Sequence, residues 1–243
     1  EVKKLKNRVG KCLYGFFHSQ ECGARQPEFT VCERSYVVKM KKYTNIHKLS
    51  DNRFLNLFQL DALTDTGRKF DYFFVSRRKA EHIKLLTKDM KAEGVVIYPV
   101  WKDDPDKIVL LRQYRYPIGD YLYELPAGLI DGEETAEEAA VREMKEETGL
   151  DFIVYDGGND AYRRPFFMGA GFTDESCNAV FGYAFGTISR DDMEDTETIQ
   201  VLVVDKAEAA RILKEEKVSI RAAYLLMNFL HSNREKPFAF LEG

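Results

Sequence analysis

The sequence predicts a mixed α/β fold, of the α/β or α+β sandwich type, preceded by a small antiparallel β domain. Two observations predict it. Strand-sized apolar runs such as Val95–Val100 alternate with helical patterns in the second half of the chain, and two aromatic-rich runs flank a turn in the first half. No run approaches the roughly 18 apolar residues that a membrane-spanning helix needs, so we expect no membrane partner.

The N-terminal part predicts a hairpin. Apolar residues between Phe54 and Ser76 flank the turn Thr64-Asp65-Thr66-Gly67, a pattern typical of two antiparallel strands. We therefore assign residues 40–88 to a small β domain, with the polar segment Lys79–Gly94 as its connector. Residues 1–39 show no sustained period and precede Met40, which resembles a native start, so we interpret them as an extension outside the functional core.

Residues 89–243 are predicted to form the main domain. One helix is expected from Thr135 to Thr148, because Thr135 and Glu138 have capping-box spacing and Gly149 is placed to end the helix. Two later helices are expected at 206–216 and 219–231. The strands are expected at 95–100, 107–113, 121–125, 151–156, 178–188 and 200–205.

Composition excludes several classes of function. The chain has 36 basic and 40 acidic residues and a net charge of −4, so we expect no nucleic-acid partner from its global charge. Its four cysteines are too sparse for a disulfide framework, and the ten-residue spacing of Cys12, Cys22 and Cys32 lacks the close pairs typical of zinc sites. With no signal-like N-terminus, a cytoplasmic location is expected.

Three carboxylates mark the helix predicted at 135–148. Glu143, Glu146 and Glu147 lie at positions i, i+3 and i+4, so they share one face. Like charges at this spacing destabilise a helix, and the ordinary alternative is that they solvate an exposed surface. A divalent cation would supply the missing compensation, because hard ions such as Mg²⁺ prefer oxygen ligands.

The surrounding spacing resembles the Nudix box of the Nudix hydrolase family. The matching pattern is Gly128, five residues, Glu134, seven residues, then Arg142-Glu143-aliphatic-x-Glu146-Glu147-x-Gly149-aliphatic. The resemblance implies a Nudix-type α/β/α sandwich that hydrolyses a nucleoside diphosphate linked to another group. It also implies that Glu143, Glu147 and the carbonyl of Ala127 bind Mg²⁺, with Mn²⁺ as the alternative ion. Glu146 would support or share the metals, and Arg142 would orient a glutamate.

Two further segments are similar to the ADP-ribose pyrophosphatase branch, also called ADP-sugar pyrophosphatases. They are Arg112–Pro117 and Glu124–Asp131. In that branch an arginine corresponding to Arg115 approaches the phosphates, and a glutamate corresponding to Glu124 lines the site. For Arg115, a surface cation at a strand end is the alternative interpretation.

The segment Gly169–Glu175 resembles the catalytic loop of the same branch. The resemblance makes Glu175 the candidate general base. Gly169-Ala170 stands where the branch has Ser-Pro, so Asp174 remains an alternative base, and a solvated loop acid is the alternative for Glu175.

Members of this branch usually form dimers in which the N-terminal β unit is exchanged, and we expect a homodimer here. Phe70 and Tyr72, just before Arg77 and Arg78, match the aromatic positions that contribute to adenine stacking in this branch, although strand packing also explains alternating aromatics. Phe70 and Arg78 are therefore candidate substrate-binding residues. The expected reaction converts ADP-ribose or a related ADP-sugar into AMP and a sugar phosphate. The alternatives are hydrolysis of another nucleotide sugar or a dinucleotide, and a Nudix-fold module that binds a nucleotide without cleaving it.

Overall fold

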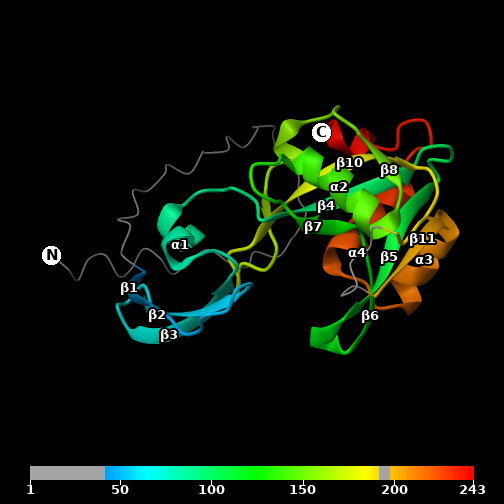
Figure 1. The fold of residues 1–243 in the computed structure, drawn as a ribbon. Helices are drawn as coiled ribbons and strands as arrows, with labels where there is room; N and C mark the ends of the chain where they lie inside the picture. Colours follow the sequence, from blue (N-terminus) through cyan, green and yellow to red (C-terminus); the bar gives the residue numbers. More distant parts are fainter. Residues whose placement is uncertain (1–41, 192–197) are drawn as a thin grey trace, which may run out of the picture. The chain divides into compact units, whose positions relative to one another are not determined.

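A computed structural model describes residues 42–191 and 198–243 (Figure 1). The predicted extension at 1–39, with Cys12, Cys22 and Cys32, lies outside the described residues. The residues from Lys41 to Gly243 cluster as one compact unit, and the further division at residues 88 and 89 stays a prediction.

The N-terminal sheet has three antiparallel strands in the order β1-β2-β3. The strands are β1 (Tyr43–Lys48), β2 (Asn56–Leu63) and β3 (Lys69–Ser76). The predicted hairpin is confirmed: β2 pairs with β3, and Gly67 has the left-handed φ of 80° that its turn requires. Strand β1 was not predicted, because its sequence is mostly polar and its side chains are largely exposed.

A small apolar core covers one face of this sheet. Phe58 and Phe74 stack with their ring centroids 5.3 Å apart, and the fully buried Ile83 packs with them. Ile83 lies between the 3₁₀ helix η2 (Ala80–His82) and the helix α1 (Lys84–Thr87). The predicted polar connector Lys79–Gly94 therefore contains two short helices, each too short to show a helical period in the sequence.

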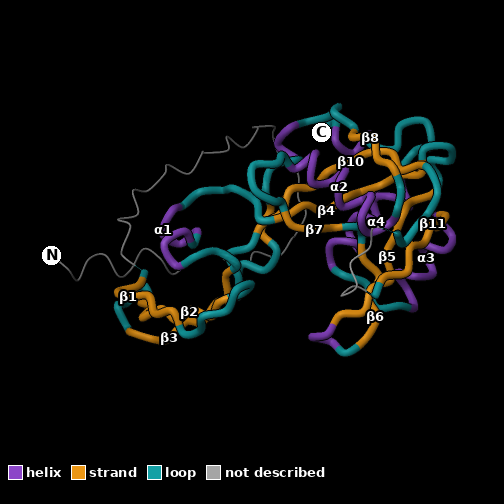
Figure 2. The backbone as a smooth tube through the Cα atoms, in the orientation of Figure 1, coloured by secondary structure: helices purple, strands orange, loops and turns teal. Residues whose placement is uncertain are grey.

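The main sheet has eight strands, drawn in orange in Figure 2. Five follow the order β11-β5-β4-β10-β8, while β6, β7 and β9 pair with β5, β4 and β10, respectively. The central pair, β4 and β10, is parallel, and the other pairs are antiparallel. The strands are β4 (Gly94–Trp101), β5 (Lys107–Arg115), β6 (Asp120–Glu124), β7 (Ala127–Leu129), β8 (Asp151–Val154), β9 (Phe166–Phe167), β10 (Ser176–Phe185) and β11 (Ile199–Asp205).

Helices cover both faces of the main sheet (Figure 1). Successive side chains of β4 belong alternately to two apolar cores, one on each face. Val95 and Ile97 pack with α2 (Ala136–Thr148), whereas Val96 and Tyr98 belong to the core that contains α3 (Lys206–Glu215) and α4 (Ile220–His231). The remaining short helices are η3 (Tyr116–Ile118), η4 (Asp160–Tyr162) and η5 (Ala239–Leu241). The predicted α/β/α sandwich with a small N-terminal β sheet is confirmed.

The helix α2 begins and ends where the sequence predicts. The Thr135 hydroxyl accepts a hydrogen bond from the backbone N–H of Glu138 at 3.2 Å, and the Glu138 carboxylate accepts one from the backbone N–H of Thr135 at 2.8 Å. Gly149 ends the helix with a φ of 75°. None of the helices in the described ranges has the length and apolar character needed to cross a membrane.

Tyr98 places an unpaired hydroxyl in the main core. The side chain is 1% exposed, and within the described ranges its hydroxyl has no hydrogen-bond partner. Because leaving a buried polar group unsatisfied is costly, we expect Tyr98→Phe to raise the free energy of unfolding by about 1 kcal/mol in a urea titration. Tyr224→Phe, at a residue that is 63% exposed, is the control and should leave stability unchanged. A less stable Tyr98→Phe variant would contradict this prediction.

Candidate active site

The acidic face of α2 lies against the backbone of β7. The Glu147 carboxylate accepts a hydrogen bond from the backbone N–H of Ala127 at 3.1 Å, and its residue is only 3% exposed. At Gly128, a Cβ atom would lie 1.9 Å from the carboxyl carbon of Glu143. A Cβ atom at this position would displace the Glu143 carboxylate. The structure thus brings Ala127, Glu143 and Glu147 together, and their role as metal ligands stays a prediction.

Arg142 is the counter-charge of this acidic face. Its Nη1 donates to Glu143 and to Glu146, each at 2.8 Å, and its Nη2 donates to Glu134 at 2.7 Å and to the carbonyl of Leu129 at 2.8 Å. The hydrogen bond from Arg142 lowers the pKa of Glu134, and Glu134 in turn raises the pKa of Arg142 above its ordinary range. Arg142 therefore holds three carboxylates in defined directions, and its role in catalysis stays a prediction.

The donor set suits a hard divalent cation. Glu143 and Glu147 present carboxylate oxygens beside the Ala127–Gly128 backbone, and oxygen atoms are the ligands that Mg²⁺ and Mn²⁺ prefer. In the part of the chain that the structure describes, no three acidic, histidine or cysteine side chains form a ready-made cage. Mg²⁺ does not need one, because it usually binds through one or two carboxylates and keeps several waters.

A second charged group surrounds Glu124 at the end of β6. Its side chain is 6% exposed, accepts a hydrogen bond from Nε of Arg115, and lies 3.6 Å from Nη2 of Arg221. The two predicted residues Arg115 and Glu124 are thus brought together.

Sequence analysis missed Arg221, which lies in the first turn of α4, far along the chain from the motif. A cation at a helix N-terminus opposes the helix dipole, and this is the sequence signal that could have drawn attention to it. Its neighbour Glu124 offsets that cost.

The loop before β10 holds its two acids differently. Glu175 forms an ion pair with Arg77, with 3.3 Å between Oε2 and Nε, whereas Asp174 accepts a hydrogen bond from the backbone N–H of Lys84 at 3.0 Å. At the same end of the sheet, Cys177 pairs with Gly94 of β4, and Gly94 pairs with Leu129 of β7. The loop thus enters the sheet at the end where β7 contacts Glu143 and Glu147. The role of Glu175 as the base stays a prediction.

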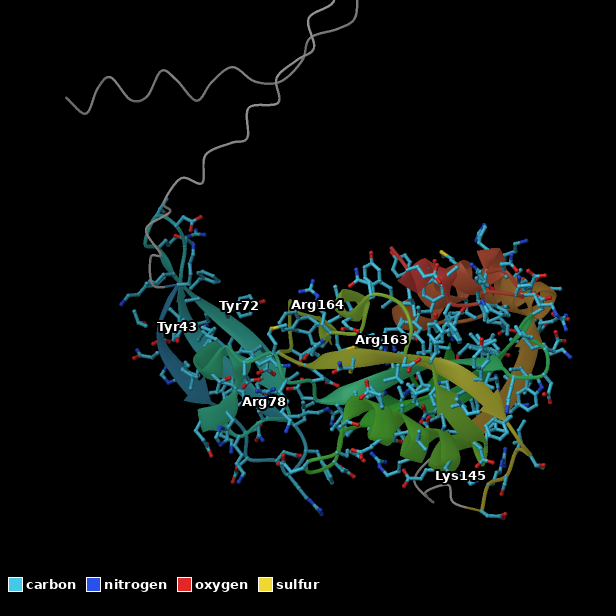
Figure 3. The ribbon with its side chains drawn as sticks, turned by 90° about the horizontal axis from the view of Figure 1, so that it is seen from above. Tyr43, Tyr72, Arg78, Lys145, Arg163 and Arg164 are labelled. Atoms are coloured by element: carbon cyan, nitrogen blue, oxygen red, sulfur yellow. The ribbon has the colours of Figure 1, made fainter. Side chains whose placement is uncertain are left out.

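Arg78 and Phe70, the other predicted substrate residues, lie in the N-terminal part of the structure. Figure 3 shows Arg78 and Tyr72 there. The Arg78 guanidinium is largely buried and donates to Asp89, to Glu93 and to two backbone carbonyls. Its hydrogen bonds hold the pKa of Asp89 well below the usual range. A substrate role for Arg78 would require breaking these bonds, and it stays a prediction.

The aromatic candidates lie on β3. Phe70 is 42% exposed, and the Tyr72 hydroxyl donates a hydrogen bond to the carbonyl of Gly171 at 2.6 Å. Tyr72 therefore contacts the loop that carries Glu175. Phe70 instead pairs with Ala62 of the neighbouring strand β2. The predicted contribution of Phe70 to substrate binding stays a prediction.

Comparison with known proteins agrees with this geometry. The family model described as NUDIX domain matches residues 90–225, more than half of the chain, so the chain belongs to the Nudix family. Enzymes of this family typically use divalent metal ions.

Among curated relatives, an ADP-sugar pyrophosphatase of Mus musculus is 41% identical over 109 residues, which cover 44% of this chain and 46% of that protein. An ADP-ribose pyrophosphatase of Saccharomyces cerevisiae is 40% identical over 75 residues, covering 30% of this chain and 32% of that protein. The chain thus matches about half or less of the length of these relatives.

A solved structure described as that of an ADP compounds hydrolase has the same fold. It superposes with a TM-score of 0.57 at 21% identity and covers 79% of this chain and 96% of that chain.

The close approach at Gly128 is testable by adding one carbon atom. We expect Gly128→Ala to push the Glu143 carboxylate aside and to lower the free energy of unfolding by about 1 kcal/mol, because the displaced carboxylate loses its hydrogen bond from Arg142. Urea titration measures this change. Gly171→Ala is the matched control, because nothing lies within 4 Å of its Cβ position. Equal stability of the two variants would contradict the close contact.

Proposed function

We propose that the chain is a divalent-metal-dependent Nudix hydrolase that cleaves the diphosphate bond of ADP-ribose or a related ADP-sugar. The products are AMP and a sugar phosphate. The observation that carries this proposal is the approach of Glu143 and Glu147 to the Ala127–Gly128 backbone. The mouse and yeast relatives, described as ADP-sugar and ADP-ribose pyrophosphatases, support the choice of substrate.

Glu143, Glu147 and the carbonyl of Ala127 would hold the metal, with Glu146 supporting it. A divalent ion bound by these residues would supply positive charge to the diphosphate oxygens and would lower the pKa of a bound water molecule. Arg142 keeps the carboxylates in fixed directions through its hydrogen bonds, so little reorganisation is needed when the substrate binds.

Arg115 would bind the substrate phosphates. Its Nε donates a hydrogen bond to the Glu124 carboxylate. Its two terminal nitrogens form no hydrogen bond with other described residues. A guanidinium presents a planar fork of donors that matches phosphate oxygens, and Glu124 holds this fork in one orientation. Arg221 adds a second positive charge beside Glu124, so the group as a whole favours an anion.

Glu175 would act as the general base. It would accept a proton from the attacking water while the new oxygen–phosphorus bond forms and the bond to the bridging oxygen breaks. Its ion pair with Arg77 orients the carboxylate.

We also propose that the working enzyme is a homodimer. Phe70 and Tyr72 are 42% and 37% exposed on one face of β3, and a second copy of the chain would remove these aromatic rings from water. Light scattering coupled to gel filtration of the full chain should give twice the monomer mass. A monomer mass at all concentrations would reject the dimer.

The test of function is a substrate panel with and without metal. The full chain is incubated with ADP-ribose, ADP-glucose, GDP-mannose and NADH in Mg²⁺ or in EDTA, and products are separated chromatographically. We expect AMP from ADP-ribose in Mg²⁺, the highest kcat/KM for an ADP-sugar, and no product in EDTA. A higher kcat/KM for GDP-mannose or NADH would move the enzyme to another branch. Binding of ADP-ribose without cleavage would indicate a non-catalytic module.

Two variants of α2 separate metal binding from helix charge. Glu147→Gln should lower kcat at least about 100-fold, because losing a direct ligand should cost no less than losing its supporting residues. Glu137→Gln, at an exposed position in the same helix, should retain the wild-type rate. Circular dichroism should show both variants folded. A folded Glu147→Gln variant with unchanged kcat would remove Glu147 from the metal site.

A further inference from the structure

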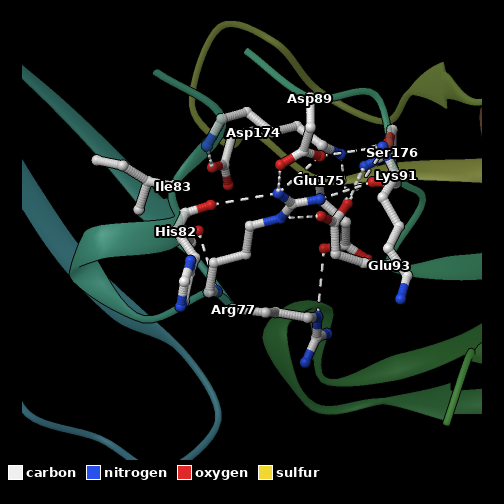
Figure 4. A network of polar contacts seen from close by, with 12 residues as sticks. Arg77, His82, Ile83, Asp89, Lys91, Glu93, Asp174, Glu175 and Ser176 are labelled. Atoms are coloured by element: carbon white, nitrogen blue, oxygen red, sulfur yellow. Dashed lines mark hydrogen bonds and ion pairs between the residues drawn. The ribbon is translucent and has the colours of Figure 1, made fainter. Parts of the chain in front are cut away.

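A buried polar cluster joins Lys84, Glu93 and Ser176 (Figure 4). Oε2 of Glu93 accepts hydrogen bonds from Nζ of Lys84 and from the backbone N–H of Ser176, each at 2.7 Å. Nζ of Lys84 also donates to the Ser176 hydroxyl. The Lys84–Glu93–Ser176 cluster therefore fixes the residue that directly follows Glu175.

Stability alone does not account for this cluster. The side chains of Lys84 and Glu93 are 6% and 9% exposed, and Ser176 is fully buried. Burying an ion pair carries a desolvation penalty that its Coulomb attraction often only balances, and apolar replacements are frequently as stable. What the cluster provides is a defined geometry, because Oε2 of Glu93 meets two donors at once.

The backbone of Glu93 connects the two loops of the proposed site. Its N–H donates to the carbonyl of Ser176 at 2.9 Å, and its carbonyl accepts from the N–H of Ile130 at 3.0 Å. Ile130 directly follows β7, whose Ala127 and Gly128 contact the metal-binding glutamates. Glu93 is thus hydrogen-bonded both to the segment that follows β7 and to the residue that follows the candidate base Glu175.

Neighbouring contacts hold the rest of the Glu175 loop to the same part of the chain. The N–H of Val75 donates to the carbonyl of Phe172 at 2.8 Å, and Arg77 pairs with Glu175 (Figure 4). Removing the Glu93 carboxylate would therefore loosen one end of the loop without detaching all of it.

We propose that Glu93, with Lys84 and Arg78 as its counter-charges, is a positioning residue that sets the distance between Glu175 and the metal-binding glutamates. The proposal rests on the proposed hydrolase function. Glu93 touches neither substrate nor metal; it acts through Ser176 on the position of Glu175. Since small misplacements of a reacting group are costly, the loss of this contact should lower kcat more than it changes KM.

The first experiment measures Glu93→Gln in the full chain. We expect kcat for ADP-ribose to fall about 10- to 100-fold with KM nearly unchanged. Hydrogen exchange should become faster in peptides covering 169–176 and stay unchanged in α2. Lys206→Met is the control for loss of an ion pair elsewhere, because Lys206 pairs with Asp106 at 3.0 Å, and it should keep the wild-type kcat.

The second experiment tests whether Glu93 acts through Glu175. If it does, Glu93→Gln should lower kcat much less in a Glu175→Gln background than in the wild type, because the two changes then act on one step. If the fold-loss in kcat of the double variant equals the product of the two single losses, the proposal is overturned. A wild-type kcat for either single variant would also overturn it.

A third variant separates position from stability. Lys84→Met combined with Glu93→Gln removes the Lys84–Glu93 ion pair and leaves Arg78 paired with Asp89, so we expect it to regain stability relative to the single variants while kcat stays low. Recovery of kcat together with stability would show a merely structural role.

If the wild-type chain cleaves no diphosphate, the proposed function fails. The hydrogen-exchange rates of residues 169–176 then still decide whether Glu93 holds the loop. Unchanged exchange rates in Glu93→Gln would overturn the positioning proposal.

Discussion

The whole candidate site depends on the contact between two carboxylates of α2 and the backbone that enters the Nudix helix. Glu143 occupies the space where a side chain at position 128 would lie, and Glu147 accepts the N–H of Ala127. This contact requires α2 and β7 to lie on the same part of the sheet. Strand β4 achieves that by pairing with β7 while its Val95 and Ile97 pack beneath α2.

Acidic residues this close need compensation in the protein itself. Arg142 supplies it through hydrogen bonds to three glutamates. The nearly buried Glu124 has a hydrogen bond from Arg115 and an ion pair with Arg221. In the group around Arg142, arginine rather than lysine allows one side chain to satisfy several acceptors at fixed angles. The site thus consists of carboxylates whose directions are set before any ligand arrives.

Local signals made much of the fold predictable. The helix α2 could be predicted because its cap, its end and its acidic face all lie within one short segment, and the β2–β3 hairpin because its turn lies between two apolar runs. Strand β1 and helix α1 were missed because one is polar and the other is a single turn, so neither has a period to detect.

The parts of the site that the sequence did not indicate depend on contacts between distant segments. Arg221 meets Glu124 only after α4 packs on the sheet, and Lys84 meets Ser176 only when α1 reaches β10. Neither pair has a spacing that marks it in the sequence. The partners of Arg77 and Arg78 could not be predicted from the sequence either, although the two residues are adjacent. Arg77 pairs with Glu175, whereas Arg78 pairs with Asp89 and Glu93.

The parallel pairing of β4 with β10 has a consequence for how the molecule acquires its shape. Gly94 and Cys177 are neighbours in the sheet but far apart along the chain, so their pairing closes a long loop and carries the entropy of doing so. Contacts of this kind slow folding, whereas α2 and the β2–β3 hairpin can form from nearby residues. A newly made chain is therefore expected to possess its acidic helix well before the opposing loop arrives, and to complete the candidate site among its last folding events.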